Sequence, residues 1–272
     1  MEINKEVGKL LCSVKEKGPL VHHITNYVTV NDCANIVLAL GGSPVMADAK
    51  EEVSDMVSIA SALVINIGTL NHTTVESMII AGKKANELDI PVILDPVGVG
   101  ATPYRKEIAL KLINEVKFSI IKGNLAEIKI LNGMKAVSKG VDSEETSSDD
   151  AKDVAKDLAK KLDAVIAVTG KSDYISDGKS IFKIENGIEM LKTITGSGCM
   201  TASLIGTFAG VTKDYLIAAS AGVMTMGIAG EIAYEKLNKC DSGSGSFRMK
   251  LIDSIFNLTA EDFLKRGRVY EG

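Results

Sequence analysis

The chain has 272 residues, of which 46% are hydrophobic and 24% are charged, and its formal net charge is −4. This length suits one large α/β domain or two small ones, and the apolar share is enough to bury a sizeable core. The acidic balance argues against nucleic acid as the main partner, because nucleic-acid-binding proteins usually carry a basic face, whereas a small phosphate-bearing ligand needs only a local positive site.

Short apolar runs alternate with longer amphipathic stretches up to about residue 168. The clearest strand candidates are apolar almost throughout, as expected for parallel strands that helices cover on both faces, and they span residues 63–67, 92–94, 118–121 and 164–168. The amphipathic stretches span residues 72–87, 103–114, 125–131 and 148–161. This spacing predicts βαβ units in a doubly wound, mostly parallel α/β sheet.

The remaining segments complete the predicted organisation. The polar residues 138–150 predict a surface loop, and no shift in composition follows them, so we expect one domain over residues 1–272. Residues 174–176 and 180–184 predict a β-hairpin, because the Asp177-Gly178 step between them favours a tight primed turn. The chain is mainly helical from Ser197 onward. Its long apolar run at 215–230 falls short of the roughly 20 residues that a membrane span needs, and it predicts a buried helix.

The cysteines and the first residues point to a cytoplasmic protein without a membrane partner. The four cysteines are widely spaced and form no CxxC pair, so reduced thiols are expected rather than zinc or redox chemistry. The first six residues contain no apolar signal region.

Small or polar residues follow each predicted strand, where ligands of an open parallel sheet bind. Asp95 either caps a turn or is a Mg²⁺-linked carboxylate that faces ATP phosphates. Asn124 and Glu127 have the spacing of a capping box, and Glu127 is also a candidate holder of a metal-bound water. Lys122 is either a solvated charge or a phosphate contact.

The turn Thr195-Gly196-Ser197-Gly198-Cys199-Met200 is the most informative stretch. Its glycines free the backbone, and the helical pattern that follows places a positive helix end at the turn. Together these features predict an anion site at Gly196, Ser197 and Gly198, suited to phosphate charge; the alternative is an ordinary loop before a core helix.

Cys199 would lie in the first turn of that helix. Buried cysteine is most often inert packing, but a helix N-terminus lowers a thiol pKa, so Cys199 is also a candidate acceptor for the proton of an attacking alcohol. Met46 follows Gly41-Gly42-Ser43-Pro44, and it is either a core methionine or a contact to a ring-bearing ligand.

The common nucleotide-binding motifs are incomplete in this chain. Gly170-Lys171-Ser172 resembles the end of a P-loop, but Val165 stands where the earlier glycine is required. Gly98-Val99-Gly100 is not completed to GxGxxG, because Pro103 occupies the last position. The sequence therefore excludes a Walker-type NTPase and a standard dinucleotide binder.

Taken together, the motifs resemble those of the hydroxyethylthiazole kinases of thiamine biosynthesis, within the ribokinase-like kinases. The resemblance covers nearly the whole chain and weakens after about residue 234. It is carried by Pro19 to His22 with Ile24-Thr25-Asn26, Asn31-Asp32, Ala34-Asn35, Gly42 to Ala47, Leu63 to Leu70, Leu94 to Thr102, Lys122-Gly123-Asn124 with Glu127, Val168-Thr169-Gly170 and Thr195 to Met200.

The resemblance implies a three-layer α/β/α kinase that phosphorylates 4-methyl-5-(2-hydroxyethyl)thiazole with ATP and Mg²⁺. It also implies a homotrimer that binds the thiazole between subunits. It implies that Met46, Gly196 and Asn26 contact the thiazole and that Lys122 and Thr169 contact ATP. Asp95 and Glu127 would interact with the metal and the phosphates, and Gly196, Ser197 and Gly198 would form an anion hole. Cys199 would occupy the position of the catalytic base.

Two departures and two alternatives accompany this expectation. The family usually has Arg where this chain has Lys122, so positive charge is retained but bidentate phosphate binding is lost. His23 stands at a variable position and receives no role, while His22 is expected to make structural hydrogen bonds. The alternatives are a sister kinase for hydroxymethylpyrimidine, which Cys199 and the Met46 region argue against, and a nucleotide-binding protein without catalysis.

Overall fold

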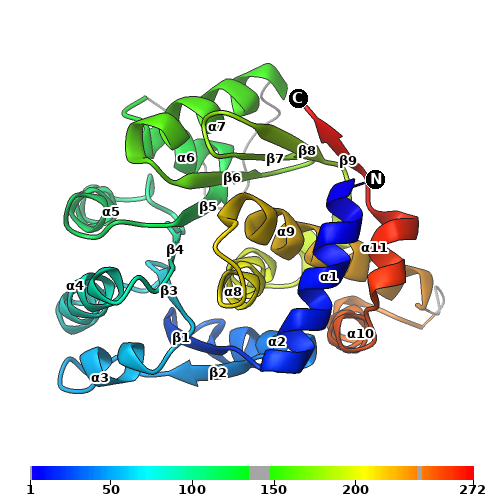
Figure 1. Ribbon diagram of the computed structural model, residues 1–272, viewed down its shortest axis with the longest axis horizontal. Helices are drawn as coiled ribbons and strands as arrows, with labels where there is room; N and C mark the ends of the chain where they lie inside the picture. Colours follow the sequence, from blue (N-terminus) through cyan, green and yellow to red (C-terminus); the bar gives the residue numbers. More distant parts are fainter. Residues whose placement is uncertain (1, 135–147, 238–240) are drawn as a thin grey trace.

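The computed structural model describes residues 2–134, 148–237 and 241–272. Within these ranges one sheet of nine strands has the order β2-β1-β3-β4-β5-β6-β7-β8-β9 (Figure 1). The paired strands from β2 to β6 run parallel, and β6 to β9 pair antiparallel. The strands are β1 Leu20–Ile24, β2 Ser43–Met46, β3 Ala62–Asn66, β4 Val92–Asp95, β5 Ile120–Asn124, β6 Val165–Thr169, β7 Asp173–Ser176, β8 Ile181–Ile184 and β9 Val269–Glu271.

Helices cover both faces of the sheet and give the expected three layers (Figure 1). One face carries α3 Val53–Ser58, α4 His72–Glu87, α5 Pro103–Glu115, α6 Leu125–Leu131 and α7 Ser148–Leu162. The other face carries α1 Glu2–Lys17, α2 Val30–Leu40, α8 Ser197–Ala209, α9 Tyr215–Glu235, α10 Ser244–Phe256 and α11 Ala260–Arg266, with a short 3₁₀ helix at Glu189–Thr193.

The core lies in two layers because side chains alternate across each strand. Val64 and Ile93 pack with the helices around α8 and α9, whereas Leu63, Ile65 and Leu94 pack with the helices from α3 to α7. Every residue of β3 and β4 is buried, which explains why these strands have continuous apolar runs.

The structure confirms the predicted strands as β3 to β6 and the predicted amphipathic stretches as α4 to α7. One boundary differs in a way that matters: the strand expected at 118–121 is β5, Ile120–Asn124. Lys122 pairs with Ala167 and Asn124 with Thr169 in the ladder to β6. Polar side chains at a strand end do not stop backbone pairing, so these residues belong to the strand itself. The surface loop expected at 138–150 falls largely outside the described residues.

The hairpin is confirmed, but its turn differs from the expected tight form. β7 and β8 pair from Asp173 opposite Ile184 to Ser176 opposite Ile181, which leaves residues 177–180 as the connection. The Oδ1 atom of Asp177 accepts the N–H groups of Lys179 at 2.8 Å and Ser180 at 2.7 Å. This local side-chain bonding replaces a two-residue primed turn.

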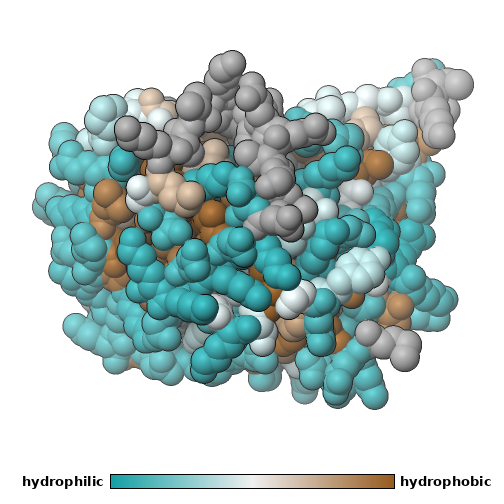
Figure 2. All heavy atoms as spheres, turned by 90° about the horizontal axis from the view of Figure 1, so that it is seen from above, coloured by the Kyte–Doolittle hydropathy of each residue, from teal (hydrophilic) through white to brown (hydrophobic). Residues whose placement is uncertain are grey.

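The long apolar run forms α9, which is long and apolar enough to cross a membrane. Its most apolar window is, however, 89% buried inside the protein, so the expected buried helix is confirmed. It packs against α8, α10 and α1. The face of the molecule in Figure 2 is mainly hydrophilic, with apolar residues between the hydrophilic ones, as is usual for a folded surface.

We predict that Gly206→Ala destabilises the fold by about 1–3 kcal/mol, because α8 crosses the sheet closely at this glycine. A Cβ atom there would lie 2.5 Å from Cγ2 of Val64. The matched control is Gly245→Ala in α10, where an added Cβ atom meets nothing within 4 Å. Urea unfolding should place the Gly206 variant below the parent and the Gly245 variant at or above it. Equal midpoints would show that α8 can shift at no cost.

Candidate functional site

The carboxyl ends of four neighbouring strands bring polar residues to one edge of the sheet. Asn66 closes β3 and pairs with Asp95, which closes β4. Asn124 closes β5 and pairs with Thr169, which closes β6. α8 packs against β3 and β4. The predicted ligand edge is therefore a continuous polar row above a buried sheet.

Asp95 and Lys122 form a buried ion pair at the centre of this row. The Nζ atom of Lys122 donates to Oδ1 of Asp95 at 3.2 Å, and the two side chains are 6% and 0% exposed, respectively. Burial by itself would lower the pKa of Lys122, but the carboxylates of Asp95 and Glu127 outweigh it and hold that pKa above its usual value. Lys122 is thus a buried cation, which excludes the solvated-charge interpretation.

Asn66 lies beside this pair and had no role in the sequence prediction. Its Nδ2 atom donates to Oδ2 of Asp95 at 2.7 Å and to Sγ of Cys199 at 3.3 Å. Its Oδ1 atom accepts the N–H of Gly68 at 2.8 Å and Nδ2 of Asn26 at 3.0 Å. The carboxylate of Asp95 therefore bonds to two side chains and does not cap a turn. A polar residue that ends an apolar strand was the only signal for Asn66 in the sequence.

Asn26 follows β1 and holds the other side of Cys199. Its Nδ2 atom donates to Sγ of Cys199 at 3.4 Å. Its Oδ1 atom accepts the N–H and the hydroxyl of Thr29, each at 3.1 Å. The sulfur of Cys199 thus accepts two amide hydrogen bonds from two different strand ends.

Gly196 is the N-cap residue of α8 and has a left-handed φ of +80°. A Cβ atom there would lie 2.4 Å from Cγ2 of Thr29, so both the conformation and the space require glycine. No side chain caps the helix at Gly196, which leaves its first N–H groups free of side-chain partners. A Cβ atom on Gly198 would lie 2.9 Å from Nζ of Lys122. A helix N-terminus and a buried cation therefore lie side by side, as the predicted anion site requires.

The pKa of Cys199 contradicts the sequence expectation. The thiol is 8% exposed, and burial together with the nearby Asp95 carboxylate raises its pKa to about 12. Desolvation of the thiolate outweighs the helix N-terminus and the ammonium of Lys122. Cys199 is therefore a neutral thiol at physiological pH, and the predicted fall in its pKa is wrong.

Asn124 and Glu127 form the predicted capping box at the start of α6. Oδ1 of Asn124 accepts the N–H of Glu127 at 2.9 Å, and Oε2 of Glu127 accepts the N–H of Asn124 at 2.8 Å. Oε1 of Glu127 accepts the N–H of Gly98 at 2.8 Å, so both carboxylate oxygens are engaged. Burial raises the pKa of Glu127. This one side chain therefore ties the loop after β4 to the start of α6.

Met46 and Thr169 mark the two sides of the polar row. Met46 ends β2, and three strand steps of about 4.8 Å each separate β2 from the strand of Asp95. Thr169 lies on the other side, and its hydroxyl donates to the carbonyl of Gly123 at 3.3 Å. The structure brings Asn26, Asp95, Lys122 and Cys199 together, with the glycine turn and Glu127 against them, whereas Met46 stays at the margin.

The site also includes a buried carboxylate that the sequence did not reveal. Asp173 begins β7, and its Oδ1 atom accepts the N–H of Gly170 at 2.9 Å. Burial raises the pKa of Asp173 to about 7. The turn after Thr169 is therefore held by a side chain three residues further along the chain, at the start of the next strand.

Both histidines of β1 are buried and structural. Nε2 of His22 bonds to the carbonyl of Ala47 at 2.7 Å, as expected. His23 bonds to the carbonyl of Val21 at 3.0 Å and to the hydroxyl of Ser203 at 3.1 Å. Burial lowers the pKa of His23 to about 4, so this imidazole is neutral.

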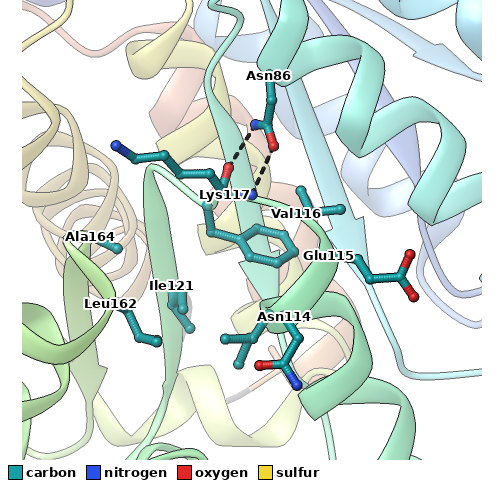
Figure 3. Close-up of a pocket in the computed structure, with 10 residues that line it drawn as sticks. Asn86, Asn114, Glu115, Val116, Lys117, Ile121, Leu162 and Ala164 are labelled. Atoms are coloured by element: carbon teal, nitrogen blue, oxygen red, sulfur yellow. Dashed lines mark hydrogen bonds between the residues drawn. The ribbon is translucent and has the colours of Figure 1, made fainter.

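A hollow of about 360 Å³ lies at the opposite edge of the sheet, where β5 and β6 begin (Figure 3). The side chain of Asn86 bonds there to both backbone groups of Lys117. None of the candidate residues lines it. The hollow is lined by Asn86, Ile113, Asn114, Glu115, Val116, Lys117, Phe118, Ile121, Leu162 and Ala164.

Known proteins are similar to this chain in sequence and in fold. The model of the hydroxyethylthiazole kinase family matches residues 11–261. The hydroxyethylthiazole kinase of Clostridium tetani is 58% identical, with 99% of each chain covered. That of Alkaliphilus oremlandii is 56% identical, with 100% of each chain covered.

Solved structures agree with these relatives. The structure of a hydroxyethylthiazole kinase protein from Pyrococcus horikoshii has a TM-score of 0.89 at 41% identity and covers 98% of this chain and 99% of its own. The pyridoxal kinase of Staphylococcus aureus has a TM-score of 0.61 at 17% identity and covers 77% of this chain and 86% of its own. The second likeness concerns the fold alone, and it confirms the expected ribokinase-like architecture.

We predict that iodoacetamide labels Cys199 far more slowly than Cys12 at pH 7.5, because only the thiolate reacts and Cys199 is buried with a raised pKa, whereas Cys12 is exposed. Since the pKa is raised, the thiolate fraction of Cys199 should grow about tenfold per pH unit without a plateau below pH 10. Peptide mapping by mass spectrometry reports both sites in one sample. Labelling of Cys199 that levels off near pH 7 would contradict the raised pKa.

Proposed function

Because the chain belongs to the hydroxyethylthiazole kinase family, we propose that it transfers the γ-phosphoryl group of ATP to the hydroxyl of 4-methyl-5-(2-hydroxyethyl)thiazole. The product is the thiazole phosphate used in thiamine biosynthesis. One observation carries this proposal beyond the family: the start of α8, with Cys199, lies against the buried Asp95–Lys122 pair. Phosphoryl transfer depends mainly on positioning and charge stabilisation, and this arrangement supplies both.

In the proposed complex the hydroxyl of the thiazole alcohol lies next to Cys199. Asn26 and the backbone at Gly196 contact the ring, and Met46 completes its pocket from the margin of the sheet. Cys199 is protonated, so it donates or accepts a hydrogen bond and does not remove the proton of the alcohol. That proton passes to an oxygen of the transferred phosphoryl group as the new O–P bond forms, which a loose transition state allows.

The phosphates of ATP occupy the row between Thr169 and the glycine turn in this proposal. Lys122 remains charged in its buried place and offsets the negative charge of the transferred group. The N–H groups at Gly196, Ser197 and Gly198 form the anion hole, because they begin a helix without a side-chain cap. Thr169 contacts the nucleotide from the end of β6.

The donor set fits Mg²⁺ that arrives with the nucleotide. No group of three or more potential ligand residues occurs in the part of the chain that the structure describes. Mg²⁺ usually keeps several waters and binds one or two carboxylates together with phosphate oxygens. Asp95 and Glu127 are each already hydrogen-bonded, which suits a role through water. The ion would neutralise charge that develops on the phosphates.

We also propose that three subunits assemble with the thiazole site between them. Each subunit would be a single domain, and the protein would act in the cytoplasm. Tyr27 and Val28 support the assembly, because they follow Asn26 directly and are 79% and 57% exposed. Large apolar side chains beside a substrate pocket are typical of a surface that a partner subunit covers. The described free thiols, Cys12, Cys33 and Cys199, are compatible with a reducing compartment.

The expected substrate is testable against its main rival. Purified protein with ATP and Mg²⁺ should convert the thiazole alcohol to its phosphate and leave hydroxymethylpyrimidine largely unreacted, as followed by product chromatography. Turnover of the pyrimidine but not of the thiazole would show that the protein has the activity of the sister kinase. Binding of ATP without turnover of either alcohol would support a protein that has lost catalysis.

The assembly is testable by sedimentation. We expect a species of three times the 28.8 kDa chain. Tyr27→Arg should shift the distribution toward smaller species, because it places a charge in the proposed contact. Leu264→Arg is the matched control, since Leu264 is also exposed, at 51%, but lies on α11. A monomer in the parent protein would overturn the proposed trimer.

A further inference from the structure

We infer that Asn66 is a positioning residue for this reaction: its carboxamide connects Cys199 to Asp95 and holds both in their reactive places. The inference rests on the proposed function and adds to it a residue that need not touch either substrate. It concerns four hydrogen bonds made by one side chain that is 2% exposed.

The first step is that the carboxamide of Asn66 uses its whole hydrogen-bonding capacity. An asparagine side chain has two N–H donors and an oxygen with two lone pairs. The two donors go to Asp95 at 2.7 Å and Cys199 at 3.3 Å. The oxygen accepts from Gly68 at 2.8 Å and from Asn26 at 3.0 Å. A buried group satisfied in this way has one stable orientation.

The second step is that the partners assign that orientation. Asp95 presents a carboxylate oxygen, which requires a donor from Asn66. The sulfur of Cys199, which also faces the amide of Asn26, is compatible with a second donor. Gly68 presents an N–H, which requires an acceptor. A flipped amide would place its oxygen against the carboxylate and its NH₂ group against an N–H, and both contacts are repulsive.

The third step links this orientation to the reaction. With Oδ2 held by Asn66, Asp95 meets Lys122 through Oδ1, so the carboxylate cannot turn freely. With Sγ held by Asn66 and Asn26, the thiol of Cys199 is fixed at the first turn of α8. Asn66 therefore ties the acceptor side of the site to its phosphate side. A displacement of about 1 Å between such groups can cost on the order of 100-fold in rate.

A packing role makes a different prediction from a positioning role, and one pair of variants separates them. Asn66→Asp keeps the shape of the side chain but replaces the donors with an oxygen that faces the carboxylate of Asp95. Asn66→Ala removes the contacts without adding a charge. If Asn66 only fills space, the isosteric Asp variant should be the more active one. If it positions Asp95 and Cys199, the Asp variant should be the less active one.

The experiment measures steady-state kinetics with ATP, Mg²⁺ and the thiazole alcohol. For Asn66→Ala we expect kcat to fall about 10-fold to 100-fold while the KM for ATP changes less than about threefold, because the loss concerns the transition state. For Asn66→Asp we expect kcat to fall by at least about a further threefold, because the new carboxyl group repels the carboxylate of Asp95. The melting temperature should be highest for the parent, lower for the Ala variant and lowest for the Asp variant.

Asn186 supplies the matched control. It is also buried, at 5% exposed, and its side chain donates to the carbonyl of Arg266 at 2.9 Å and accepts the N–H of Arg268 at 2.8 Å. It also lies beside a carboxylate, Glu231, at 3.3 Å. Asn186→Ala and Asn186→Asp should lower the melting temperature but leave kcat within about twofold of the parent. A similar loss of kcat at Asn186 would attribute the effect at Asn66 to loosening of the fold.

The outcomes separate this inference from the proposed function. A parent protein that phosphorylates the thiazole while Asn66→Asp matches or exceeds Asn66→Ala would overturn the positioning role and leave the function standing. A parent protein without turnover would overturn the function, while the melting order of the Asn66 variants would still test the hydrogen-bond assignment. If the Asp variant does not fold, Asn66→Ser replaces it, with kcat expected between the parent and the Ala variant because one donor is kept. A Ser variant no better than Ala would count against the inference.

Discussion

Asp95 and Lys122 are two opposite charges buried at the centre of the sheet edge, and the polar groups around them are arranged to satisfy these charges. Removing a carboxylate and an ammonium from water costs several kcal/mol each, so such a pair persists only when further polar groups satisfy it. Asn66 donates to the carboxylate, and the carboxylate of Glu127 adds to the field that keeps Lys122 charged. The start of α8 lies against the same ammonium. The network is thus a precondition for burying the charges as well as a candidate phosphate site.

The parallel sheet was readable from sequence because β3, β4 and β6 have no polar residue before their last positions. β3 and β4 are buried on both faces, and a continuous apolar run reports that directly. β1 was missed because His22 and His23 interrupt its apolar pattern. Their hydrogen bonds to Ala47, Val21 and Ser203 come from other elements, and they make the two imidazoles tolerable in the core. β9 was missed because it is a short, mostly exposed edge strand.

The site was only partly readable. Asp95, Lys122 and the Asn124–Glu127 capping box were recognised because their local spacing carries information. The direction of the Cys199 pKa shift was predicted wrongly, since it depends on burial and on the carboxylate of Asp95, which lies far away in the chain. Asn66 was not assigned a role because its partner Asp95 lies 29 residues away in the chain. Asp173 has a local partner, the N–H of Gly170 three residues before it, but an isolated Asp at a strand boundary looks like an ordinary turn residue.

The burial of α9 has a consequence during synthesis. Its apolar surface is covered by α8 before it in the chain, by α10 after it, and by α1 from the N-terminus. While the ribosome is still making α10 and α11, the nascent chain carries an apolar helix with one side uncovered. Such a segment is a natural target for chaperones that bind exposed apolar stretches. The packing of α9 is therefore completed only after α10 has been made, although the helix itself precedes α10 in the chain.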